Sequence, residues 1–152
     1  MIVRPEQARS AMAEIKIFTI DEAERALPLV RRVLSDLKAE YATWREAVAA
    51  YELLSSRGPA GQPDPEGLDD SRAAVTLAAE RINGYLQELE AIGCLFKGFE
   101  EGLVDFYALK DDRPVFLCWK LGEEHITHWH EVDAGFSGRR PIEGGAFSGI
   151  VP

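Results

Sequence analysis

The sequence predicts an α+β protein, in which a long antiparallel helical hairpin with heptad seams precedes a small three-stranded antiparallel meander. Two apolar seams at helical spacing lie on either side of a proline- and glycine-rich loop, and short aromatic and β-branched runs follow them. A length of 152 residues suits one domain. We expect a flexible lead-in at 1–14, a single domain at 15–142 (hairpin 19–93, β module 94–142) and a flexible tail at 143–152.

The first helix has a clear start signal. Thr19 stands three residues before Glu22, which is the pattern of a capping box. We expect a helix from Ile20 to about Ser56, with a kink near Pro28. Apolar residues then recur in alternating steps of four and three, a seam of period 3.5. The seam comprises Ala23, Leu27, Val30, Leu34, Leu37, Tyr41, Trp44, Val48 and Tyr51.

The second helix follows the loop. Asp64 before Pro65 suits an N-cap with a first-turn proline, while Asp69 and Asp70 offer later starts. Gly93 comes directly after the seam, where a C-terminal capping glycine is expected. The seam comprises Leu68, Val75, Ala78, Ile82, Tyr85, Leu89 and Ile92. Such a pair of helices predicts an antiparallel hairpin.

The two seams predict self-association. The first seam is longer than the second can cover, and Tyr41, Trp44, Tyr51 and Tyr85 are bulky for a two-helix seam. A four-helix assembly would bury these side chains better. We therefore expect a homodimer through the helical hairpin.

Charge and composition exclude several partners. Acidic residues outnumber basic ones 26 to 17, so we expect neither a nucleic acid nor an anionic membrane as partner. No stretch approaches the ~20 apolar residues of a membrane span, and the start of the chain lacks the apolar core of a secretory signal. Cys94 and Cys118 form no C-x-x-C pair, which fits a reducing cytoplasm but leaves their redox state open.

Three runs in the C-terminal part predict strands at 103–109, 114–121 and 126–132. Asp105 interrupts the first run, so it either faces solvent or is buried with a partner such as His128, His130 or Arg139. Cys118, within the second run, is expected to be a small core residue rather than a nucleophile.

The three histidines fall within six residues of one another. His128 and His130 would share one face of a strand, and H-x-H is an ordinary metal-ligand spacing. Solvated or hydrogen-bonded histidines are the alternative, because no H-E-x-x-H pattern accompanies them.

Several runs carry a resemblance to a known family. They are Phe18-Thr-Ile-Asp-Glu-Ala-Glu-Arg-Ala-Leu-Pro-Leu-Val30, Gly102-Leu-Val-Asp-Phe, Leu117-Cys-Trp-Lys-Leu-Gly-Glu123, Trp129-His-Glu131 and Gly135-Phe-Ser-Gly-Arg139. Over about residues 15–142 the chain resembles the bacterial domain of unknown function 2203 family. The resemblance implies no activity. It centres on the positions of Asp105, Cys118, Trp119, Glu123, Trp129, His130 and Arg139.

The family pattern does not include His125 and His128, and this makes the H-x-H metal site a weaker hypothesis. Our candidate binding residues are Asp105, Glu123, His130, Arg139 and Trp129, and the candidate metal ligands are Asp105, Glu123 and His130. The cofactor that these residue types suggest is a divalent metal. The alternative is a purely structural network in which Asp105 pairs with Arg139 and Glu123 pairs with His130.

Two functions follow from these residues. The leading hypothesis is a cytoplasmic interaction or ligand-binding module that binds an unknown protein or small molecule through its C-terminal β module. The alternative is a metal-dependent or acid/base enzyme using Asp105, Glu123 and His130.

Overall fold

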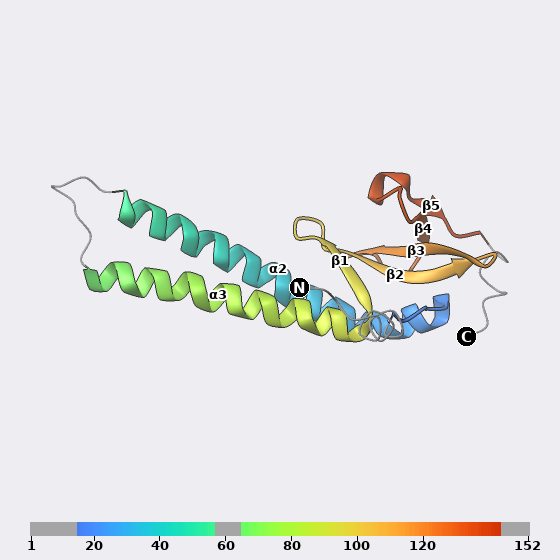
Figure 1. Cartoon of the computed structure of the whole chain (residues 1–152), viewed down its shortest axis with the longest axis horizontal. Helices are drawn as coiled ribbons and strands as arrows, with labels where there is room; N and C mark the ends of the chain where they lie inside the picture. Colours follow the sequence, from blue (N-terminus) through green and yellow to red (C-terminus); the bar gives the residue numbers. More distant parts are fainter. Residues whose placement is uncertain (1–14, 57–64, 144–152) are drawn as a thin grey trace, which may run out of the picture.

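A computed structural model describes residues 15–56 and 65–143 of the chain. Helices α2 (Ile20–Ser55) and α3 (Pro65–Ile92) form a long hairpin, and an antiparallel sheet lies at one end of it (Figure 1). The remaining elements are β1 (Cys94–Gly98), β2 (Leu103–Lys110), β3 (Arg113–Lys120), β4 (His128–Glu131), the 3-10 turn η2 (Phe136–Gly138) and β5 (Arg140–Pro141). The predicted α+β architecture is confirmed. The expected lead-in at 1–14, the N-cap candidate Asp64 and the tail beyond residue 143 lie outside the described residues.

The sheet has five strands in the order β1-β2-β3-β4-β5, two more than the sequence predicted. Strand β1 follows α3 directly after Gly93, and β5 is only two residues long. Neither strand carries an alternating pattern long enough to be read from the sequence. The third predicted strand is shorter than expected, because Ile126 lies in a loop where its N–H binds the Glu24 carboxylate at 2.6 Å.

The start of α2 confirms the predicted capping box. The Thr19 hydroxyl accepts the Glu22 N–H at 3.1 Å, and the Glu22 carboxylate accepts the Thr19 N–H at 3.0 Å. The bond from the Thr19 N–H lowers the pKa of Glu22. The helix then continues through Pro28 to Ser55, so the kink near Pro28 stays a prediction.

The end of α3 confirms Gly93 as the capping glycine. Its φ is +106°, and its N–H donates to the Leu89 carbonyl at 3.1 Å. A Cβ at this position would lie 3.3 Å from the Phe18 ring. Glycine therefore allows the chain to turn straight from the helix into β1.

One face of the sheet packs on the hairpin. Strand alternation directs Val104, Phe106, Leu117 and Trp119 into the core. There they meet the first half of the α2 seam, namely Ala23, Leu27, Val30, Leu34 and Leu37.

The hairpin extends well beyond the sheet (Figure 1). In this distal part the α2 seam residues Tyr41, Trp44, Val48 and Tyr51 are only half-buried. Tyr41 stacks on Phe99 of the β1–β2 turn, with ring centroids 4.2 Å apart. This turn therefore covers one of the four side chains. Within the described residues no helix is long and apolar enough to cross a membrane.

The capping box yields a stability prediction. Replacing Thr19 by Ala removes the acceptor for the Glu22 N–H and should lower the free energy of unfolding by about 1 kcal/mol. Urea denaturation followed by circular dichroism measures this loss. Thr43→Ala is the matched control, because Thr43 is exposed in mid-helix and its hydroxyl binds only the Ala39 carbonyl of the preceding turn. A control loss as large as that of Thr19→Ala would contradict the capping role.

Candidate functional site

The sheet face that points away from the hairpin carries a buried polar cluster. It consists of Asp105, Cys118 and His130, which are 2%, 1% and 3% exposed. Each alternates with residues of the core, so all three side chains lie on the same outer face. Asp105 is directly opposite Cys118 in the strand register, and His130 is opposite Phe116 on the next strand. Three adjacent strands therefore contribute one residue each.

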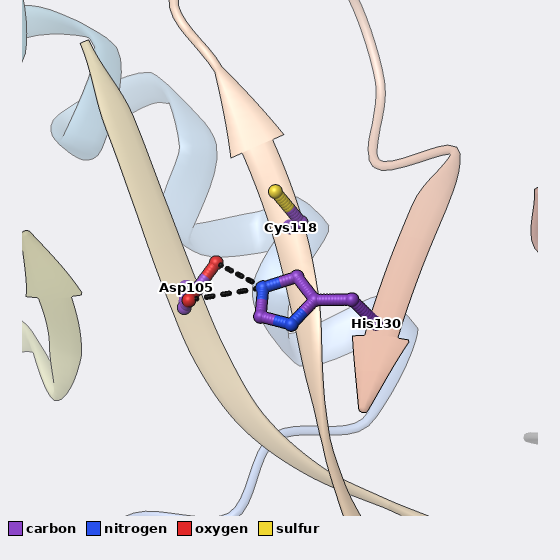
Figure 2. Close-up of side chains that lie close together, drawn as sticks. All are labelled: Asp105, Cys118 and His130. Carbon is purple, nitrogen blue, oxygen red and sulfur yellow. Dashed lines mark hydrogen bonds and ion pairs between the residues drawn. The ribbon is translucent and has the colours of Figure 1, made fainter. Parts of the chain in front are cut away.

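His130 reaches across β3 to Asp105, as Figure 2 shows. Its Nε2 lies 3.1 Å from both carboxylate oxygens of Asp105, and its Nδ1 lies 2.7 Å from the Glu131 carbonyl oxygen. Because a carbonyl oxygen only accepts, Nδ1 must carry a hydrogen. Nε2 and the carboxylate then need one further proton between them, either on the ring or on Asp105. The pair is thus a buried acid–base couple that holds a shared proton.

Cys118 lies beside this couple. A carboxylate oxygen of Asp105, a ring nitrogen of His130 and the Cys118 sulfur all lie within 4.8 Å of one another. Burial, and to a smaller degree the Asp105 carboxylate, raises the pKa of Cys118 to about 12. The thiol therefore keeps its proton at neutral pH and is a poor nucleophile as it stands.

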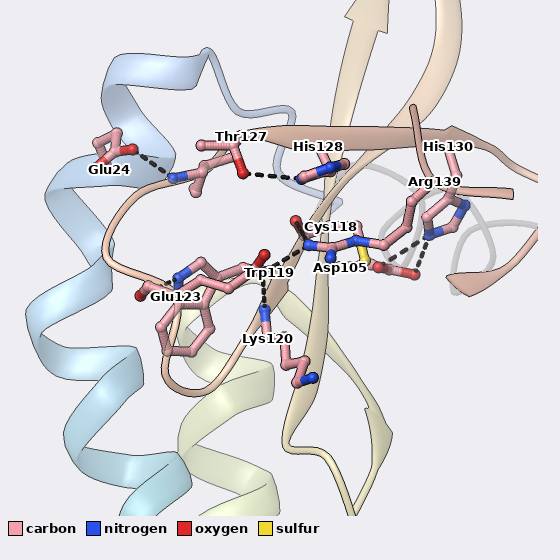
Figure 3. A network of polar contacts seen from close by, with 11 residues as sticks. Glu24, Asp105, Cys118, Trp119, Lys120, Glu123, Thr127, His128, His130 and Arg139 are labelled. Atoms are coloured by element: carbon pink, nitrogen blue, oxygen red, sulfur yellow. Dashed lines mark hydrogen bonds and ion pairs between the residues drawn. The ribbon is translucent and has the colours of Figure 1, made fainter. Parts of the chain in front are cut away.

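A second network joins the β3–β4 loop to the segment before β5 (Figure 3). The Nη2 of Arg139 donates to the Glu123 carboxylate at 2.6 Å and to the Cys118 carbonyl at 3.2 Å. The same Glu123 oxygen accepts the Lys120 N–H at 2.7 Å. Burial alone would lower the pKa of Arg139, but its contacts with Glu123 and Cys118 outweigh burial and raise it. Among the described residues, the buried Nε of Arg139 has no hydrogen-bond acceptor.

The structure pairs the candidate residues differently from the structural network that was the alternative in the sequence. Asp105 pairs with His130 rather than Arg139, and Glu123 pairs with Arg139 rather than His130. The physical reason is the strand face. Asp105 and His130 share the outer face of the sheet, whereas Glu123 lies in the loop after Gly122, beside the end of β3.

The other predicted residues lie outside the cluster. Trp129 belongs to the core on the hairpin side of the sheet. His125 binds Glu24 through Nδ1 at 3.3 Å, and the Nδ1 of His128 lies 2.8 Å from the Thr127 hydroxyl. Of the three histidines, only His130 therefore joins the group of candidate metal ligands, and Cys118 takes the place predicted for Glu123.

From the sequence we expected Cys118 to be a small core residue, and its place beside Asp105 and His130 was not predicted. A signal was present in the turn between β2 and β3. Asp111 and Asp112 both have positive φ and form a two-residue turn that pairs Lys110 with Arg113. Counting back from this pair places Asp105 opposite Cys118.

A pocket of about 240 Å³ opens in front of the cluster. Its base is formed by Asp105, Cys118 and His130. The rest of its wall comes from Lys97, Leu103, Phe116, Val132, Gly135 and Phe136. The segment after β4 thus covers the outer face of the sheet and leaves an opening above the polar groups.

The fold and the site together define a hairpin-and-sheet protein with an Asp–His–Cys cluster beneath a small pocket. The chain belongs to the family described as an uncharacterized conserved protein (DUF2203), whose model matches residues 16–142. This match confirms the resemblance seen in the sequence. No curated protein and no solved structure matches the chain.

The His130–Asp105 couple yields a second stability prediction. His130→Ala should lower the free energy of unfolding by about 2–3 kcal/mol, because it leaves Asp105 buried without its partner. Asp105→Asn should cost less, since the amide can donate to the unprotonated Nε2 of His130. Denaturant unfolding in the presence of a chelator measures both changes.

His125→Ala is the matched control, because His125 is exposed and its contact with Glu24 is a surface pair. It should change stability by less than about 1 kcal/mol. A His130→Ala protein as stable as this control would show that the couple does not stabilise the fold.

Proposed function

We propose that this chain is a small-ligand-binding module, whose binding site is the pocket above Asp105, Cys118 and His130. The observation that carries the proposal is the buried contact of the His130 Nε2 with both Asp105 carboxylate oxygens, at 3.1 Å, at the base of an open pocket. Burying two ionisable groups is costly, so a fold that needed only stability would be served better by apolar residues there. Clusters of this kind concentrate at functional sites.

The size and lining of the pocket support a ligand of few atoms. Its volume of about 240 Å³ falls below the ~300–1,000 Å³ typical of pockets for drug-sized molecules. Lys97 lies at the wall with its ammonium 5.5 Å from the centre of the Phe116 ring, and Phe136 is also part of the wall. A small polar molecule or an ion fits such a mixture of charge, aromatic surface and hydrogen-bonding groups.

An acid/base enzyme is the second candidate function. The observation that favours it is again the Asp105–His130 contact, which borders the pocket, because a carboxylate and an imidazole in contact can exchange a proton with a bound substrate. Glu123 is held by Arg139 and by the Lys120 N–H. In such an enzyme Asp105 and His130 would transfer the proton, and Glu123 would position the loop.

Nuclear magnetic resonance titration tests the binding site. Acetate, phosphate and methylammonium serve as probes of different charge, and we expect at least one to shift backbone amide signals around Asp105, Cys118 and His130. Val132→Trp should abolish these shifts, because the larger side chain fills the pocket. Leu77→Trp is the control, since Leu77 is similarly exposed but lies on α3, away from the pocket. Shifts that persist in Val132→Trp, or that lie elsewhere, would contradict this site.

We also propose that the hairpin forms a homodimer by coiled-coil-like packing on a second copy. The distal seam residues Tyr41, Trp44, Val48 and Tyr51 are half-buried, although they continue the same heptad pattern as the buried half. Leu53 nearby is 63% exposed. Both helices are acidic overall, since α2 has seven acidic and five basic residues and α3 has six acidic and two basic ones. The charges of the helices therefore do not select a partner face, and the apolar residues favour the dimer: packing on a second copy would bury the distal seam in a four-helix bundle.

A groove also runs along the hairpin nearer the sheet, away from the distal seam, and is a second surface that a partner could contact. It has a volume of about 590 Å³ and is lined by α2 and α3 residues that include Val33, Tyr85 and Ile92. Leu29 on its wall is 53% exposed. Arg32, Asp36 and Glu88 also line the groove, so its wall mixes apolar and charged side chains, as surfaces that contact another protein commonly do.

Light scattering tests the dimer. Trp44→Glu should shift the mass from dimer towards monomer, because a charge would be buried without a partner in the bundle. Thr43→Glu adds the same charge at an exposed neighbouring position and should leave the dimer intact. A monomeric mass for the unmodified chain across micromolar concentrations would refute this assembly.

The proposal also includes a cytoplasmic location and, on the resemblance alone, a bacterial source. Cys94 and Cys118 are both free and buried. Burial raises the pKa of Cys94, like that of Cys118, to about 12. Two unoxidised thiols fit a reducing compartment.

A further inference from the structure

The base of the pocket brings together three donor atoms of different chemistry. A carboxylate oxygen of Asp105, the Cys118 sulfur and a ring nitrogen of His130 lie within 4.8 Å of one another. Oxygen, nitrogen and sulfur donors in one site are typical of Zn²⁺ and its neighbours among the transition metals, whereas Mg²⁺ and Ca²⁺ prefer oxygen alone.

The distances between these donor atoms are close to those between the ligand atoms of a bound metal ion. With metal–ligand bonds of ~2.0–2.3 Å, a tetrahedral Zn²⁺ places its ligand atoms roughly 3.3–3.8 Å apart. The His130 Nε2 already lies 3.1 Å from each Asp105 oxygen. Because the three residues stand on adjacent strands, a side-chain adjustment of about 1 Å would gather the donors without moving the sheet.

The orientation of His130 is an independent indication. Its Nδ1–H donates to the Glu131 carbonyl at 2.7 Å, which directs Nε2 towards Asp105 and Cys118 (Figure 2). Histidines that bind metals are usually held in this way, with the second ring nitrogen donating to a carbonyl or carboxylate. The imidazole is therefore positioned as a ligand before any ion arrives.

The charges of the three proposed ligand residues also fit a dication. A carboxylate and a thiolate together would neutralise an ion of charge +2, while Arg139 is already balanced by Glu123. A bound metal deprotonates a coordinating thiol, so the proton that Cys118 holds in the metal-free protein does not prevent binding. Arg139 binds the Cys118 carbonyl and fixes the backbone of this ligand.

We propose that Asp105, Cys118 and His130 bind one divalent transition-metal ion, with Zn²⁺ the best match, and leave a fourth coordination position open to the pocket. This names the ligand of the site proposed above and rests on that site. On binding, the ion replaces the Cys118 thiol proton and the proton between His130 and Asp105, and both protons pass to solvent. Three protein ligands with one open position are the arrangement of catalytic rather than structural zinc sites.

Cobalt substitution tests the proposal in the full-length chain. We expect metal-free protein to bind one Co²⁺ per chain and to develop a thiolate-to-cobalt charge-transfer absorption together with the strong visible bands of tetrahedral cobalt. Added Zn²⁺ should displace the cobalt and remove both signals. Cys118→Ser should abolish the charge-transfer absorption.

Cys94→Ser is the matched control, because Cys94 is the other buried thiol and lies outside the cluster. It should keep the full spectrum. Cys118→Ala serves as a second variant should the serine hydroxyl disturb folding, and circular dichroism verifies that each variant is folded. Asp105→Asn should weaken Zn²⁺ binding at least tenfold in competition with a coloured chelator.

The outcomes separate this inference from the proposed function. No cobalt spectrum, or a charge-transfer absorption that survives in folded Cys118→Ala, would overturn the metal site. If acetate, phosphate or methylammonium still shifted the pocket signals in that case, the ligand-binding module would stand with a different ligand. If neither the metal ions nor these three probes affected the pocket, both proposals would fail.

Discussion

The pleat of the β-sheet, which sends successive side chains to opposite faces, determines both the core and the candidate site. Val104 and Phe106 enter the core while Asp105 between them faces outward. In the same way Leu117 and Trp119 enter the core on either side of Cys118. A shift of one residue in strand register would exchange the two sets and place a carboxylate against the hairpin. The apolar core therefore fixes the positions of the polar cluster.

The hairpin also holds the strand that carries His130. The Glu24 carboxylate of α2 accepts the Ile126 N–H, and the Nη2 of Arg31 donates to the Glu124 carbonyl at 3.2 Å. These two contacts fasten the loop before β4 to the first turns of α2. Because Ile126 is itself buried, the loop is held by packing as well as by hydrogen bonds. The position of His130 thus depends on contacts with a helix far away in the sequence.

The sequence predicted those features that depend on neighbours along the chain. The Thr19 capping box and the Gly93 cap were identified because each needs only a few adjacent residues. The pairing of Asp105 with His130 was one of several open alternatives, because β3 lies between them and only the register decides which residues meet. The partner of Glu123 could not be derived, since Arg139 approaches it through a loop and a 3-10 turn of no regular period.

The two edges of the sheet have a consequence for how molecules of this protein meet. On one side, the pairing of β1 with β2 shifts between Phe96 and Gly98, which is an irregularity that twists an edge away from a flat ladder. On the other side, β5 has two residues and ends in Pro141, which has no N–H to offer. Both edges are poor templates for adding a strand from another chain, so the sheet is protected from edge-to-edge aggregation. A homodimer of the kind proposed above would therefore not need the sheet edges.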